Sequence, residues 1–383
     1  MVHARVRDAL TAIVIALAAG WSLSAPAAGT TASGSPRVSP NSCPTKWTVV
    51  HTPSPGTYNR LESISGVSAT DTWAAGAEDV ALAIHWNGQG WSQAAVPSNL
   101  SYFNAVHMIS SNDVWAGGYR SGSNAAHWNG SSWTAVDIAV SSGFLVNGID
   151  AAASNDVWAV GWVTRAPSGT DPATAHWDGS AWTVVPSVTV PYGGQLDAVD
   201  VLGPHDVWAV GAQFLSDGFT PQPLIEHWDG VSWTEVSSPF AAGWAWLKGV
   251  SGASGTDVWT VGTEHKQSQP QIRTLIEHWD GSIWSSVRSV NRSGTQNELN
   301  AVMAVSVTEV WAVGDYFSSS STNKPLLERW DGLSWQARDT ATSLSRDYLF
   351  GVTVIGNVRW IVGRADPPFG SYNDTLAEVS CKA

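Results

Sequence analysis

Short apolar runs, separated by turn-forming residues, recur from about residue 46 to residue 380. Each repeat contains a run that opens with Leu or Phe, then a motif resembling Asp-Val-Trp-Ala-Val-Gly, then a motif resembling His-Trp-Asp-Gly-x-x-Trp. The repeat is about 42 residues long at first and about 50 later, which is the range of β-propeller blades. The first motif is centred on Trp73, Trp115, Trp158, Trp208, Trp259, Trp311 and Trp360, and the second begins at His85, His127, His176, His227, His278 and Arg329.

Each repeat predicts four short antiparallel strands, here called a, b, c and d. Strand b carries the first motif, strand c ends at the first Trp of the second motif, and strand d begins at its second Trp. Asp-Gly or Asn-Gly between strands c and d is a strong signal for a two-residue hairpin. The sequence therefore predicts an all-β, seven-bladed β-propeller. The seven a strands begin at Leu61, Phe103, Leu145, Leu196, Leu247, Leu299 and Leu349.

The seventh blade lacks a strand d at the C-terminal end, and residues 46–50 resemble the missing strand. We therefore expect the N-terminal strand to close the ring by pairing with the C-terminal strands of blade seven. The chain has two cysteines, Cys43 and Cys381, and both align with the c–d turn of that blade. A disulfide between them would replace the missing turn and contribute roughly 4–5 kcal/mol in the loop-entropy model.

The motif tryptophans are expected to fill the space between blades, because large flat side chains at fixed strand positions pack well there. The motif histidines lie on separate blades and cannot converge on a metal. Instead, the residue two before the strand-b Trp and the residue before the strand-c Trp change together, which predicts a cross-strand pair in each blade. These pairs are Asp71 with His85, Asp113 with His127, Asp156 with His176, Asp206 with His227, Asp257 with His278 and Glu309 with Arg329.

The N-terminus has the features of a secretory signal peptide: Arg5 and Arg7, an apolar run, and the small-x-small sequence Ala25-Pro26-Ala27. The run is shorter than the ~20 residues of a membrane span. We expect a signal peptide over 1–27, a flexible leader rich in Ser, Thr, Gly and Pro over 28–42, and one propeller over 43–383. The protein is accordingly predicted to be secreted, without a membrane span, and monomeric.

Only 13% of residues are charged, and 19 Lys and Arg against 32 Asp and Glu give a net charge of −13. A chain this acidic, without a basic cluster, is a poor candidate for binding nucleic acid or anionic membranes.

The b–c and d–a loops lie on one face of such a propeller, and here they are long and differ between blades. Variable loops on a rigid ring are common binding sites. The loops of this face also carry aromatic residues outside the motifs, and aromatic platforms among polar loops suit sugar rings or extended peptides. The candidate ligand-binding residues are Tyr58, Tyr102, Tyr119, Trp162, Tyr192, Trp244, Trp246, Tyr316, Tyr348 and Tyr372, and Phe144 and Phe214 belong to the same group.

No catalytic signature accompanies these loops. The chain has no Gly-x-Ser-x-Gly elbow, no phosphate-cradling loop and no metal-ligand spacing, so we expect no metal and no cofactor and assign no catalytic residue. Loop acids such as Glu298 and Asp315 leave open a paired-carboxylate enzyme acting on a glycosidic bond.

The two motifs together resemble the tandem repeats of secreted bacterial propellers grouped with galactose oxidase-like, kelch-like and tectonin-like sequences. The resemblance covers nearly the whole repeat region and implies the propeller fold. It transfers no catalytic residue, since the kelch Gly-Gly doublet is absent. The likeness to tectonin-like lectins favours a secreted protein that binds a glycan or another extracellular polymer through its loop face. Two alternatives stay open: a carbohydrate-active hydrolase or lyase with carboxylates at the channel mouth, and a scaffold for protein partners.

Overall fold

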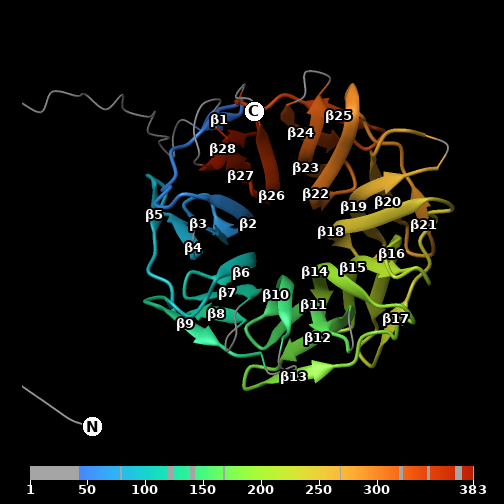
Figure 1. The fold of residues 1–383 in the computed structure, drawn as a ribbon. Coiled ribbons are helices and arrows are strands. Elements are labelled where there is room, and N and C mark those ends of the chain that lie inside the picture. Colours follow the sequence, from blue (N-terminus) through green and yellow to red (C-terminus); the bar gives the residue numbers. More distant parts are fainter. Residues whose placement is uncertain are drawn as a thin grey trace, which may run out of the picture. The chain divides into compact units, whose positions relative to one another are not determined.

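A computed structural model describes residues 43–382, except 78–79, 120–123, 139–142, 167–168, 268, 319–321, 343–345 and 367–372. In these residues all strands belong to seven four-stranded antiparallel sheets, and no helix is present. The sheets are arranged in a ring, each with its first strand nearest the centre (Figure 1). The predicted seven-bladed propeller is therefore confirmed. The described part of the chain has no helix that could cross a membrane.

The strands follow the predicted a, b, c, d order in every blade. Blades one to three contain β2 (Arg60–Ser68), β3 (Asp71–Ala77), β4 (Ala81–Trp86) and β5 (Trp91–Gln93); β6 (Tyr102–Ser110), β7 (Asp113–Tyr119), β8 (Ala125–Trp128) and β9 (Trp133–Val136); and β10 (Leu145–Ala153), β11 (Asp156–Thr164), β12 (Thr170–Trp177) and β13 (Trp182–Val185). Blades four and five contain β14 (Gly194–Gly203), β15 (Asp206–Phe214), β16 (Pro221–Trp228) and β17 (Trp233–Glu235); and β18 (Trp244–Ser254), β19 (Asp257–His265), β20 (Arg273–Trp279) and β21 (Trp284–Ser286). Blades six and seven contain β22 (Gly294–Ser306), β23 (Glu309–Ser318), β24 (Asn323–Trp330) and β25 (Trp335–Arg338); and β26 (Asp347–Ile355), β27 (Val358–Ala365), β28 (Asp374–Cys381) and β1 (Thr48–Val49).

The ring closes as the sequence predicts. β1 pairs antiparallel with β28, with Thr48 opposite Val379, and completes blade seven as its outermost strand. Cys43 and Cys381 form a disulfide across a sequence separation of 338 residues. The two ends of the ring are thus joined by backbone hydrogen bonds and by a covalent bond.

The strand-b motif needs a glycine because a bulge in strand a brings backbone atoms close to that position. In blade one the pairing register shifts between Leu61 and Ser63, so Glu62 has no partner across the sheet. Opposite the bulge, a Cβ placed on Gly76 would lie 2.1 Å from the Arg60 carbonyl oxygen, which only glycine avoids. The same close approach recurs at Gly118, Gly161, Gly211, Gly262, Gly314 and Gly363.

The motif tryptophans lie at the blade interfaces. The ring of Trp73 in blade one is 5.0 Å from that of Trp128 and 5.2 Å from that of Trp133, both in blade two. Equivalent groups join the other blades, and Trp47 packs at 5.9 Å against Trp311 where the ring closes. Each blade is thus attached to the next by a buried aromatic cluster.

Cross-strand pairs link strands b and c in blades one to five. His85 Nε2 lies 2.7 Å from Asp71 Oδ1, and the four equivalent distances are 2.8 to 2.9 Å. Each histidine ring also lies against the strand-b tryptophan of its blade, at 4.7 Å in the case of Trp73.

Blade six departs from the prediction that Glu309 pairs with Arg329. Glu309 Oε1 accepts a hydrogen bond of 2.8 Å from Arg359 in blade seven, and its Oε2 accepts one of 3.1 Å from Lys382. Arg329 instead places its guanidinium 5.7 Å from the Trp311 ring centre. The reason is that Arg359 is buried and reaches Glu309 from the adjacent blade, where an unpaired guanidinium would be costly. Burial alone would raise the pKa of Glu309, but these donors lower it to about 2.

Candidate functional site

The innermost strands of the seven blades surround a cavity of about 850 Å³ on the ring axis. Two positions per strand a supply most of the polar side chains that line it: the bulge residue and the residue three further along. Strand a runs from the loop face towards the a–b turn, so the bulge residues form a loop-side ring and the others a turn-side ring. The loop-side ring is Glu62, Asn104, Asn147, Asp197, Lys248, Asn300 and Phe350, and the turn-side ring is Ser65, His107, Asp150, Asp200, Ser251, Met303 and Thr353.

Side-chain amides connect the loop-side ring from blade to blade. Asn104 Nδ2 donates to the Val146 carbonyl at 3.0 Å and to Asn147 Oδ1 at 3.3 Å. Asn147 Nδ2 in turn donates to the Leu196 carbonyl at 2.8 Å and to Asp197 Oδ1 at 3.3 Å. These bonds fix the orientation of each amide while leaving part of its hydrogen-bonding capacity for a ligand.

Asp197 is the most densely contacted acid of the loop-side ring. The indole Nε1 of Trp246, which also lines the cavity, donates to Asp197 Oδ2 at 2.5 Å, and Gln195 donates to Oδ1 at 2.8 Å. Burial raises the pKa of Asp197 to about 6, although these donors and Lys248 oppose the shift. Asp197 therefore takes up a proton at a higher pH than an ordinary aspartate does.

Lys248 is the single ammonium group among the residues that line the cavity. Its Nζ lies 2.8 Å from Glu298 Oε2 and 3.1 Å from Asn300 Oδ1. The loop-side ring thus combines amides, carboxylates and an ammonium group, and the indole of Trp246 lines the cavity beside Asp197.

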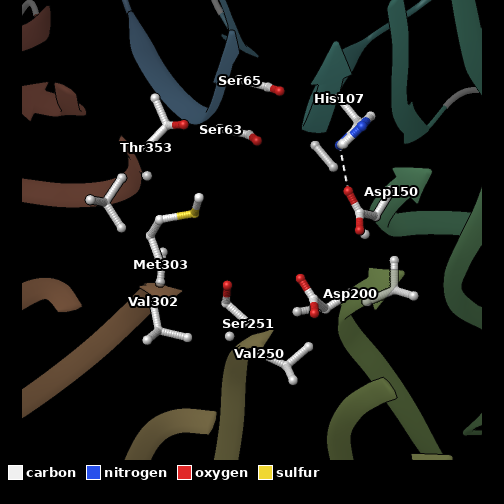
Figure 2. A pocket seen from close by; sticks show the side chains of 18 of the residues that line it. Ser63, Ser65, His107, Asp150, Asp200, Val250, Ser251, Val302, Met303 and Thr353 are labelled. Atoms are coloured by element: carbon white, nitrogen blue, oxygen red, sulfur yellow. Dashed lines mark ion pairs between the residues drawn. The ribbon is translucent and has the colours of Figure 1, made fainter. Parts of the chain in front are cut away.

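The turn-side ring contains an ion pair and a second carboxylate (Figure 2). His107 Nδ1 contacts Asp150 Oδ1, and Asp150 Oδ2 accepts the backbone N–H of Val201 at 2.6 Å. Asp200 accepts the backbone N–H of Gly252 at 3.0 Å. Burial would lower the pKa of His107, but Asp150 raises it. Burial raises the pKa of Asp200, and the neighbouring Asp150 charge adds to the shift.

Proton transfer is the chemistry that this turn-side ring could support, since it places a charged pair beside a carboxyl group that favours its protonated form. In the described residues, no group of three or more His, Cys, Asp or Glu side chains has a geometry that could hold a metal ion.

A second, smaller pocket of about 370 Å³ lies between blades seven, one and two on the loop face. Arg60 connects it to the central cavity, because its Nε lies 2.5 Å from Glu62 Oε1 of the loop-side ring. Burial raises the pKa of Glu62, and the charges of Arg60 and Arg364 oppose this. The lining residues are Tyr58, Asn59, Arg60, Ala77, Ser101, Tyr102, Arg364 and Asn373.

Four of the predicted loop-face tyrosines gather at this second pocket. Tyr58, 62% exposed, and Tyr102 line it. Tyr119 lies 6.2 Å from Tyr102 between ring centres, and Tyr348 stacks under the Arg364 guanidinium at 4.1 Å. The two rings of Trp246 and Phe214 meet edge to face at 6.1 Å, and Trp246 belongs to the central cavity.

Among the described residues, the other predicted aromatics line neither cavity. Trp244 stacks on His265 at 5.7 Å, and Tyr316 packs against the buried core between blades five and six. Tyr192 is exposed and Trp162 is half-buried. Phe144 was expected on the loop face, but it is fully buried because it joins the core between blades two and three. Tyr372 lies outside the described residues.

Sequence reasoning missed most of the cavity lining. The missed residues lie on strand a, which looked like a purely structural apolar run. A signal was present: the apolar positions of strand a keep their type from blade to blade, whereas the bulge position varies, as in Glu62, Asn104 and Lys248. Variable polar residues on the innermost strand of a propeller face its axis.

No model of a protein family matches the sequence, and no curated protein matches it. Among solved structures, the chain is similar to YCF48 bound to a D1 peptide, with a TM-score of 0.57 and 14% identity over 89% of this chain and 100% of that one. It is similar to virginiamycin B lyase from Staphylococcus aureus, with a TM-score of 0.58 and 10% identity over 88% and 99% of the two chains. It is also similar to the WD40 propeller domain of Doa1, with a TM-score of 0.56 and 9% identity over 89% and 97%. At these identities the likeness extends to the propeller fold alone.

Proposed function

We propose that this protein is a secreted binding propeller that recognises a glycan at the loop-side ring of its central cavity. The observation that carries the proposal is the composition of that ring, whose amide, carboxylate and ammonium groups line the same cavity as the indole of Trp246. The fold is shared with propellers that bind a peptide or act as a lyase, so the ligand class rests on this lining. The proposal that the protein is exported depends on the predicted signal peptide at 1–27 and leader at 28–42. These residues lie outside the described part of the chain, so export stays a prediction.

The lining matches the chemistry of a sugar. Glycan hydroxyls both donate and accept hydrogen bonds, so they pair with planar amides such as Asn147 and with the Asp197 carboxylate. The apolar face of a pyranose ring packs on an indole such as that of Trp246. A cavity of about 850 Å³ falls within the usual size of small-molecule sites and admits a short oligosaccharide.

A glycan array probed with the mature protein tests the proposal, followed by calorimetric titration of the best ligand. Trp246→Ala removes the indole from the cavity, and we expect affinity to fall roughly tenfold or more. Trp244→Ala is the matched control, because Trp244 lies two residues away in the same strand, β18, but stacks on His265 outside the cavity. Equal losses in the two variants, or no loss in either, would contradict the location of the site.

A second candidate function, an enzyme acting on the bound glycan, is favoured by the turn-side ring. His107, Asp150 and Asp200 provide a charged pair and a carboxyl group of raised pKa below the proposed sugar site. Incubating the protein with its glycan and following chain length by mass spectrometry tests this function. Cleavage that His107→Gln abolishes, with binding retained, would establish it, and an intact glycan after prolonged incubation would exclude it. Failure to bind any glycan would favour a scaffold for protein partners.

A further inference from the structure

We infer that the second pocket, at Tyr58, Arg60, Tyr102 and Arg364, is a subsite for the carboxylate of an acidic sugar residue. The inference rests on the proposed function and names its ligand class more closely, as a glycan containing uronic acid units. Neither guanidinium belongs to the repeat motifs, and none of the described residues that line this pocket is acidic. In a chain with a net charge of −13, a pocket lined by two arginines is a local exception.

The arginines are held in place by contacts on one side only. Arg60 directs its Nε to Glu62 at 2.5 Å, and Arg364 Nε lies 3.0 Å from Asp366 Oδ1 as an ion pair without hydrogen-bond geometry. Arg364 also stacks on the Tyr348 ring at 4.1 Å. Among the described residues, neither arginine makes a hydrogen bond through its Nη atoms. Two oriented guanidiniums with unused Nη–H groups are the donors that a carboxylate accepts in bidentate fashion.

Hydrogen bonds hold Asn59, one of the lining residues, in place, which lowers the cost of ordering that part of the wall around a ligand. Asn59 is buried and fully engaged: its Oδ1 accepts the Gly56 N–H at 2.9 Å, and its Nδ2 donates to the carbonyls of Gly56 at 2.8 Å and Asn373 at 2.7 Å. These bonds tie the segment before blade one to the start of β28 in blade seven. The arginines therefore line a preformed pocket.

An acidic sugar fits better here than an isolated carboxylate. The pocket volume of about 370 Å³ lies at the lower end of the range for small-molecule sites and suits a single sugar unit. The exposed Tyr58 ring offers a face for that unit. Because Arg60 contacts Glu62 of the loop-side ring, the pocket adjoins the central cavity. One oligosaccharide can therefore place an acidic unit in the pocket and its neighbours at the cavity mouth.

The test compares a glucuronic acid oligosaccharide with the same oligosaccharide after its carboxyl groups are reduced to alcohols. We expect the native protein to bind the acidic form roughly tenfold more tightly, with a preference that weakens as salt increases. The double variant Arg60→Gln, Arg364→Gln should lose the preference while keeping its affinity for the reduced form. Arg165→Gln is the matched control, because Arg165 is also a partly exposed, ion-paired arginine but lines neither pocket.

The possible failures are distinguishable. Binding of both oligosaccharides with equal affinity would overturn this inference and leave the glycan proposal standing, whereas binding of neither would count against both. If the double variant still bound the acidic oligosaccharide more tightly than the reduced one, the carboxylate would bind elsewhere and the inference would be wrong. Selective binding of an acidic peptide instead of either sugar would also overturn the inference. Thermal unfolding of each variant establishes that the protein is folded in the assay.

Discussion

Four buried glutamates in strand c make the stability of this propeller depend on pH, and Glu277 allows the effect to be measured. Its side chain is fully buried, Oε1 accepts a hydrogen bond of 2.7 Å from Ser238 in the preceding d–a segment, and Oε2 has no partner among the described residues. Burial raises the pKa of Glu277 from 4.5 to about 7, against the Ser238 hydrogen bond. The folded state thus holds a proton here that the unfolded chain releases above its ordinary pKa.

The direction in which the free energy of unfolding changes with pH follows from the linkage between proton binding and folding. A carboxyl group whose pKa is raised on folding contributes its full stabilisation below the unfolded pKa of 4.5 and loses it as the pH rises through about 7. A shift from 4.5 to about 7 corresponds to about 3 kcal/mol, at 1.36 kcal/mol per pH unit. Glu277→Gln removes the titration. Between about pH 4 and about pH 8, we therefore expect the free energy of unfolding of the variant to fall by about 3 kcal/mol less than that of the native protein.

Urea unfolding at the two pH values measures this difference. Comparing the change with pH, and not the absolute stabilities, cancels any constant cost of burying the glutamine amide. Ser286→Ala serves as the control because Ser286 is exposed, pairs with Glu277 on the neighbouring strand β21 and carries no titrating group, so the pH dependence should stay unaltered. A Glu277→Gln variant with the same pH dependence as the native protein would refute the reasoning.

Three further predictions concern the fold. Cys381→Ser should lower the free energy of unfolding by about 5 kcal/mol in the loop-entropy model, measured by denaturant titration without reductant. Gly76→Ala should prevent folding or destabilise the protein by several kcal/mol, because its Cβ would meet a carbonyl oxygen at 2.1 Å, whereas Gly90→Ala, with open space, should change stability by less than about 0.5 kcal/mol. Arg359→Gln should cost about 3–5 kcal/mol by leaving buried Glu309 without its main partner. Arg329→Gln should cost much less, and equal losses at these two arginines would contradict the blade-six assignment.

The fold was predictable because each structural feature of a blade recurs at the same position in successive repeats. The Asp-Gly turns connect strands c and d, the strand-b glycine fits opposite the strand-a bulge, and the tryptophans pack between blades. The ring closure followed from counting strands, since residues 46–50 supply the strand that blade seven lacks.

A further repeat rule lay in the sequence but was not recognised. Where strand c carries a buried glutamate, the preceding d–a segment supplies donors to it, as Ser187 does for Glu226 and Ser289 for Glu328. In blade two the corresponding residues are apolar, Val96 and Ala126. The change in both positions together identifies a contact between blades, in the same way as the Asp–His pairs identify a contact within a blade.

The candidate site was only partly predictable because it depends on which residues face the axis. Aromatic residues on long loops could be recognised, but the sequence did not separate Trp246, which lines the cavity, from Trp244, which does not. Tyr316 looked equivalent to Tyr102 on the loop face, yet it packs into an interface core. Trp244 and Trp246 both precede the bulge of β18 in regular register with β19, so the two-residue alternation of a strand gives them the same side and does not tell them apart.

A crystal structure of the protein with the best ligand from the glycan array would show where the sugar binds. We predict a sugar in the central cavity that contacts Asn147, Asp197 and Trp246. A sugar bound only to the outer loops, with the cavity free of ligand, would contradict it.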